Sequence, residues 1–210
     1  MARDLNPKCK QCRRAKEKLF LKGDRCGSPK CAMVKKAYAP GMHGQKMVRG
    51  LSEYGKQLAM KQRIKRIYGV LEKQFRKHFQ EIKNKQGVTG DLLMIRLELR
   101  LDNVVYRMGL GSSRSVARQL VNHGWIRVNG KKLTIPSAKV NVGDVITVND
   151  TKKEKGYYKN RLKVLKNKDT SPSWLSVNLS NMETKILAEP DTSSIGVNVD
   201  PQMVVEYYSR

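Results

Sequence analysis

The sequence predicts an α+β fold, in which a mainly helical N-terminal domain with a four-cysteine knuckle carries an inserted module of two helices and an antiparallel sheet. Three observations predict this class. All cysteines lie near the N-terminus, apolar residues then recur at helical spacing, and a β-hairpin signal follows beyond the middle of the chain. A length of 210 residues allows one large domain or two small ones.

The N-terminal segment holds every cysteine of the chain, arranged as two close pairs. Thirteen residues separate a C-x2-C pair from a C-x4-C pair, so both pairs can converge on one tetrahedral ion. Four thiolates leave no open coordination position, which favours a structural Zn²⁺, with a four-cysteine iron–sulfur cluster as the alternative. The expected metal ligands are Cys9, Cys12, Cys26 and Cys31. Because the segment is too short and too basic to build a core, the metal would take the place of one.

Two helices are predicted after a loop at residues 38–45, which proline and glycine punctuate. His43 in this loop is an alternative metal ligand or a surface residue. Ser52 can cap the first helix, and Gly69 suits its C-terminal end. The second helix extends to Gly87. Its apolar face consists of Leu71, Phe75, Phe79 and Ile82.

Residues 90–111 are expected to form one amphipathic helix that two glycines end. Ser112 or Ser113 then caps another helix, which stops at Gly124. Arg114 and Arg118 are four residues apart on this helix, and we expect both to project from its exposed face.

A small antiparallel sheet is predicted next. The pair Asn129–Gly130 lies between alternating apolar residues and is a strong signal for a type I′ hairpin. Residues 142–148 add a turn and a further strand. The basic stretch at 151–168 is expected to form a helix or a strand at the edge of this module.

The charge of the chain is large and uneven. The formal net charge is +25, and residues 1–100 hold 26 Lys and Arg against 8 Asp and Glu, while the last thirty residues are net acidic. This balance predicts a phosphate-bearing partner for the basic faces and an acidic end that folds back. The sequence contains no apolar run of membrane-spanning length and no secretory segment, so we expect a cytoplasmic protein without a membrane partner.

These features divide the chain into four parts. They are a four-cysteine metal knuckle with a basic arm at 1–45, a helical domain at 46–96 plus 190–210, an RNA-binding helix–helix–hairpin module at 97–168, and a connecting segment at 169–189.

Several stretches resemble a known family. RLDNVVYRMGLGSSRSVARQLVNHGWIRVNGKKLTIPSAKVNVGDVI is similar to an RNA-binding module that ribosomal, pseudouridine synthase and some tyrosyl-tRNA synthetase proteins carry. MARDLNPKCKQCRR, PGMHGQ, YGVLEKQF and VVEYYSR resemble, in the same order, the family of small-subunit ribosomal protein number four, in its metal-binding, four-cysteine bacterial branch. The resemblance extends over most of the chain.

The resemblance implies a structural protein of the small ribosomal subunit. It implies binding to the 5′ domain of the small-subunit rRNA at a multi-helix junction, nucleation of subunit assembly and support of translational accuracy. The implied partners are that rRNA and neighbouring ribosomal proteins near the mRNA entry channel, with mRNA as a further candidate. Neither an enzymatic activity nor a small-molecule substrate is expected.

The residues that we expect to contact RNA are cations or hydrogen-bonding side chains on the helices, the hairpin and the N-terminal arm. They are Arg13, Arg14, His43, Lys61, Arg63, Arg66, Arg76, Lys77, Arg100, Arg107, Arg114, Arg118, Gln119, His123, Arg127, Asn129, Lys131 and Lys132.

Two other functions remain open at this point. An RNA-modifying enzyme or its accessory would carry the same binding module, but the sequence contains no paired carboxylates with histidine, no Ser/His/Asp arrangement and no P-loop. A zinc-containing nucleic-acid-binding regulator fits the cysteine spacing, although no long heptad repeat sets a half-site spacing. Comparing the affinity for folded ribosomal RNA with that for duplex DNA separates these functions.

Overall fold

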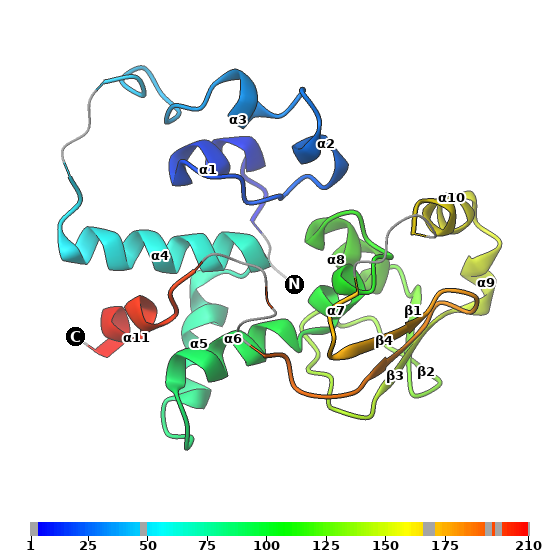
Figure 1. The fold of residues 1–210 in the computed structure, drawn as a ribbon. Helices are drawn as coiled ribbons and strands as arrows, with labels where there is room; N and C mark the ends of the chain where they lie inside the picture. Colours follow the sequence, from blue (N-terminus) through cyan, green and yellow to red (C-terminus); the bar gives the residue numbers. More distant parts are fainter. Residues whose placement is uncertain (1–3, 47–49, 166–170, 192–194, 196–198, 210) are drawn as a thin grey trace. The chain divides into compact units, whose positions relative to one another are not determined.

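The computed structural model describes residues 4–46, 50–165, 171–191, 195 and 199–209 (Figure 1). The chain forms two compact units, of which the first comprises residues 1–94 with 197–210 and the second residues 95–196. The α+β class is confirmed in this coarse form, because helices occur in both units and an antiparallel sheet in the second. Among the described residues, no helix has the length and apolar character that a bilayer crossing requires.

Helices are the regular secondary structure of the first unit in its described residues. Its helices are α1 (Lys8–Ala15), α2 (Asp24–Gly27), α3 (Ala32–Lys35), α4 (Glu53–Tyr68), α5 (Glu72–Ile82), the start of α6 (Thr89–Glu98) and α11 (Gln202–Ser209). The predicted ends of α4 are confirmed. The Ser52 hydroxyl accepts a hydrogen bond from the Gly55 N–H, and Gly69 follows the helix with a φ of 63°.

The C-terminal helix α11 packs along α4 in the first unit (Figure 1). Its Val204 is fully buried, as are Ile64 of α4 and Phe75 of α5. The Tyr208 ring stacks on Phe79 with 4.7 Å between the ring centroids. A helix of eight residues is too short to be stable alone, so this packing holds α11 in place.

Among its described residues, the second unit contains the end of α6, four further helices and a five-stranded antiparallel sheet. The elements are α7 (Leu101–Arg107), α8 (Arg114–Asn122), β1 (Ile126–Val128), β2 (Lys131–Lys132), β3 (Val145–Val148), α9 (Asp150–Lys153), α10 (Gly156–Leu165), β4 (Leu175–Asn178) and β5 (Glu183–Ile186). The strand order is β2-β1-β3-β5-β4. The hairpin prediction is confirmed, because Asn129 and Gly130 both have positive φ, as a type I′ turn requires, and Val128 pairs with Lys131.

One predicted helix is two helices in the structure. The chain leaves the helix after Glu98, and α7 starts at Leu101. Here the Val140 N–H donates to the Leu99 carbonyl at 3.0 Å, and the Leu101 N–H donates to the Ala138 carbonyl at 2.9 Å. This pairing satisfies backbone groups that a helix start leaves without partners, and apolar periodicity alone does not reveal it.

The assignment of residues 169–189 to a connecting segment is wrong over its described part. These residues supply β4 and β5, and β5 extends the sheet through the pairs Val145–Lys185 and Ile146–Thr184. Inward-facing Met182, Thr184 and Ile186 are fully buried. This period-two pattern is the signal for a strand, but it is only four residues long.

Candidate nucleic-acid interface

The end of α8 and the β1–β2 hairpin form one polar surface. Gln119, His123, Lys131 and Lys132 are all exposed, and none makes a side-chain hydrogen bond or ion pair within the described part of the chain. We call these four residues the hairpin surface. The two halves meet at Gly124, where the Lys132 side chain lies so close that its Cε would be 2.4 Å from a Cβ at this position. Glycine also permits the φ of 68° that the chain adopts there.

Two other predicted contacts near this surface already have partners. The Asn129 side chain donates to Asp144 Oδ1 at 2.8 Å and accepts from the Val145 N–H at 2.9 Å, so it stabilises the turn. Arg127 lies 3.6 Å from Asp150, and both side chains are substantially exposed. An exposed pair of this kind is weak, so Arg127 remains available to a phosphate.

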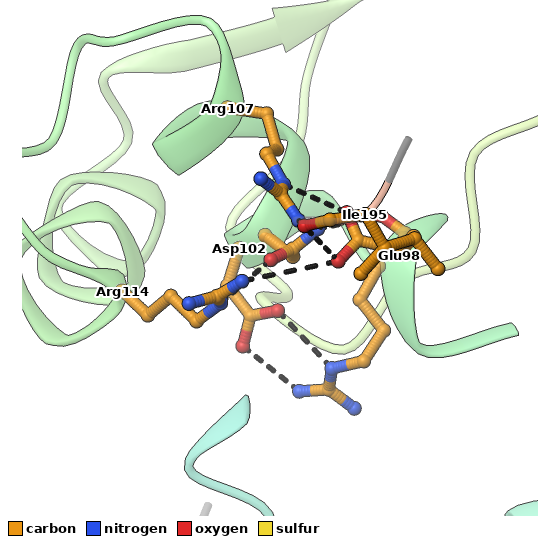
Figure 2. A network of polar contacts seen from close by, with 7 residues as sticks. Glu98, Asp102, Arg107, Arg114 and Ile195 are labelled. Atoms are coloured by element: carbon orange, nitrogen blue, oxygen red, sulfur yellow. Dashed lines mark hydrogen bonds and ion pairs between the residues drawn. The ribbon is translucent and has the colours of Figure 1, made fainter. Parts of the chain in front are cut away.

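Four of the predicted arginines belong to a buried network of charges in the second unit (Figure 2). Arg107 and Arg114 are directed at Glu98, which is fully buried. Arg107 donates to Glu98 at 2.9 and 2.8 Å and to the Ile195 carbonyl at 2.7 Å. Arg114 donates to Asn103 Oδ1 at 2.7 Å and lies 3.8 Å from Glu98. Asn103 itself donates to Glu98 at 2.7 Å.

The second carboxylate of the network is Asp102. Arg100 donates to both of its oxygens, at 3.1 and 2.8 Å, and Arg118 lies 3.5 Å from it. The expectation that Arg114 and Arg118 project from an exposed face is wrong, since Arg118 is only 8% exposed and Arg114 is half-buried. The helix presents both arginines to acids of the neighbouring segment, which its own periodicity does not reveal.

Three predicted cations of the first unit also have protein partners. Lys61 is buried, donates to Glu72 at 2.7 Å and lies 4.3 Å from the Tyr207 ring centroid. Arg63 pairs with Glu17. Arg13 donates to the Tyr38 and Ala39 carbonyls at 2.9 and 3.2 Å and thereby fixes the loop that follows α3.

The remaining predicted residues of the first unit are accessible. Arg14, His43, Arg76 and Lys77 are exposed, and Arg66 is half-buried. Lys77 approaches Glu81 at 4.0 Å, which is a weak surface pair. These positions therefore have cations that can contact phosphates, in contrast to Lys61, Arg63 and Arg13.

The four cysteines are reduced, and three of them are buried. Burial raises the pKa of the Cys12 thiol, and charges on Cys26, Cys9 and Cys31 raise it further, so the thiols interact electrostatically. The Lys22 N–H donates to Cys26 Sγ at 3.3 Å. Within the described ranges, no three His, Cys, Asp or Glu side chains are arranged to hold a metal ion. His43 is exposed.

Sequence reasoning missed Glu98 and Asp102. Both lie in the run LLMIRLELRLDNVV, where acids and arginines alternate with apolar residues in a chain that has few acids. An acid in such a place is expected to be buried with a cation, and this signal could have identified the network.

Comparisons with known proteins also divide the chain close to residue 95, where the two compact units meet in the sequence. Residues 3–98 match the family model described as the ribosomal protein S4/S9 N-terminal domain, and residues 99–146 match the S4 domain. The small ribosomal subunit protein uS4 of Syntrophomonas wolfei is 50% identical over 210 residues, covering all of both chains. The uS4 protein of Clostridium tetani is 49% identical, and uS4A of Clostridium novyi is 50% identical, each over the full length of both chains.

Proposed function

The chain belongs to the family of small ribosomal subunit protein uS4, and we propose that it is a structural constituent of the small subunit that binds ribosomal RNA. The observation that carries this proposal is the hairpin surface, whose lysines have no acidic partner among the described residues and which lies in the segment that matches the S4 domain. As a structural ribosomal protein, it is not an enzyme, and it works on the ribosome in the cytoplasm.

The finer part of the proposal concerns the RNA target and the neighbours. We propose the 5′ domain of the rRNA at a multi-helix junction, an early role in assembly and a contribution to translational accuracy. Neighbouring ribosomal proteins near the mRNA entry channel are the protein partners. The major groove of A-form RNA is too deep and narrow for side chains to read, so the hairpin surface would recognise the shape and phosphates of the junction.

Replacing Lys131 and Lys132 by alanine is expected to weaken binding to a transcript of the rRNA 5′ domain. Each lost phosphate contact should reduce the magnitude of the salt slope of log affinity by roughly 0.7–0.9. The matched control replaces the exposed Lys155, just before α10, and Lys159 of α10, which lie outside the hairpin surface. Filter binding over a salt series measures both. Equal slopes for the two double variants would contradict the assignment.

The same assay distinguishes the two rival functions. A structural rRNA-binding protein should prefer the folded transcript to duplex DNA at matched salt. A zinc-containing regulator of DNA would show the opposite order. An RNA-modifying protein would also bind the transcript, and it would be recognised by modified bases in it.

We also propose that Cys9, Cys12, Cys26 and Cys31 hold a structural Zn²⁺, with an iron–sulfur cluster as the alternative. Four thiols within one short N-terminal segment, three of them buried, support this. When bound, the ion would supply cross-linking and no catalysis, since four thiolates leave no open position.

Metal analysis of anaerobically purified protein is expected to find stoichiometric zinc and no visible absorption band. Cys26→Ser should make residues 4–46 sensitive to protease, because the cross-link is local to them. Both tryptophans, Trp125 and Trp174, lie in the second unit, so their fluorescence should be unchanged. A brown protein would identify the cluster instead, and protein without metal would contradict both alternatives.

A further inference from the structure

A pocket of about 760 Å³ lies in the first unit, where residues 4–7 and α1 face the C-terminal end of α4. One part of its lining is cationic, with Lys10, Arg14 and Arg66. Another part is apolar, with Val70 and Leu71. The volume falls within the roughly 300–1,000 Å³ that small-ligand pockets span.

The pocket concentrates positive charge. Arg14 and Arg66 make no side-chain hydrogen bond or ion pair within the described residues. Burial lowers the pKa of Arg66 and the nearby charge of Arg14 lowers it further, while the charges of Asp4 and Cys12 raise it. The acid in the lining, Asp4, accepts hydrogen bonds from Gln11 and from the Asn6 N–H and lies 3.5 Å from Lys8.

An anion in the pocket would be attracted by both guanidinium groups. Arginine suits phosphate because its planar fork donates two parallel hydrogen bonds. A run of duplex backbone would need only a flat basic surface, whereas this site is concave and has an apolar wall. The Gln62 side chain also lines the pocket and makes no hydrogen bond within the described residues, so its amide can donate to and accept from a base edge.

We propose that this pocket receives one unpaired nucleotide of the bound RNA, with its phosphate on Arg14 and Arg66 and its base against Val70 and Leu71. Unpaired bases in loops and junctions are splayed out and accessible, and proteins recognise RNA mainly at such bases. The inference rests on the proposed rRNA-binding function and adds a nucleotide subsite in the first unit, apart from the hairpin surface.

The first test adds small probe molecules to the full chain and measures their binding by NMR. Adenosine monophosphate should shift backbone resonances of residues 10–14 and 62–71 and saturate. Adenosine and inorganic phosphate should each bind at least ten-fold more weakly, since each fills one half of the site. Equal binding of inorganic phosphate would overturn the nucleotide assignment. An acidic peptide that binds as well as the nucleotide would overturn it too, as would the lack of any saturable shift.

The second test measures affinity for the rRNA transcript. The double variant Arg14→Ala, Arg66→Ala should bind the transcript at least ten-fold more weakly than the control Lys73→Ala, Lys85→Ala. The control removes two exposed cations of the same unit. Both pairs remove two charges, so counterion release is matched. Arg14 is exposed, and Arg14→Ala alone keeps the test if the double variant unfolds. Equal losses would refute the pocket while rRNA binding stands, whereas failure of the unmodified protein to bind would refute the proposed function itself.

Discussion

Replacing Glu98 by alanine is expected to destabilise the second unit by about 3–5 kcal/mol. The side chain is fully buried and accepts hydrogen bonds from Arg107 and Asn103. Its removal leaves two largely buried arginines, Arg107 and Arg114, without the carboxylate that they face (Figure 2). The loss is large compared with the total of about 5–15 kcal/mol for an ordinary domain.

Urea unfolding followed by tryptophan fluorescence measures this effect, because both tryptophans lie in the second unit. Glu98→Gln keeps the size and one acceptor oxygen, so it should fall between the unmodified protein and alanine. Asp150→Asn serves as the matched control, since this exposed carboxylate pairs only at the surface with Lys153 and Arg127. If Glu98→Ala and Asp150→Asn shift the midpoint equally, the buried network does not stabilise the unit.

The elements that the sequence predicts well are those with local signals. Backbone geometry within a few residues is determined by Ser52, by Gly69 and by the Asn129–Gly130 turn. Their effects can therefore be predicted without knowledge of the tertiary structure. The break between α6 and α7 depends on hydrogen bonds to residues about forty positions away. Strand β5 depends on pairing with β3. Neither partner can be inferred from a local apolar pattern.

The candidate site follows the same rule. The exposed cations of the hairpin surface are predictable, because a turn places them in solvent. Lys61 and Arg118 are not, since each is basic and helical in sequence yet is buried against an acid from another element. The number of cations follows from the composition, but which of them are paired with acids depends on the fold. The pocket at Arg14 and Arg66 likewise requires α1 and α4 to meet, which no motif indicates.

Deleting residues 202–210 is expected to loosen α4 and α5 and to leave the second unit unchanged. The deletion removes the fully buried Val204, which contributes roughly 1.5–3 kcal/mol, and the partly buried Tyr208 ring on Phe79. It also removes two polar links. Tyr208 donates to Glu72 at 2.8 Å, and Gln57 donates to Glu206 at 2.8 Å.

In the full chain, acid should weaken the contact of α11 with α4 and α5. Partial burial raises the pKa of Glu72, but hydrogen bonds from Lys61, Tyr208 and Lys65 outweigh this and lower it to about 2 from an ordinary 4.5. A lowered pKa means that the stabilisation is complete above about pH 4.5 and is lost as the pH falls towards 2. Glu72 is 44% exposed, so screening limits the effect to roughly 0.2–1 kcal/mol.

Amide hydrogen exchange measures the truncation, and its pattern along the chain decides the outcome. Exchange should rise across residues 53–82, because α11 covers α4 and its Tyr208 holds α5 through Phe79 and Glu72. Residues 114–148 should keep their protection. The urea midpoint of the second unit, followed by tryptophan fluorescence, should be unchanged. Tyr208→Phe is the matched point variant, since it keeps the ring and removes only the hydroxyl; it should reproduce a small part of the increase and reduce the acid sensitivity. An increase confined to residues 114–148 would mean that the C-terminal helix stabilises the second unit instead.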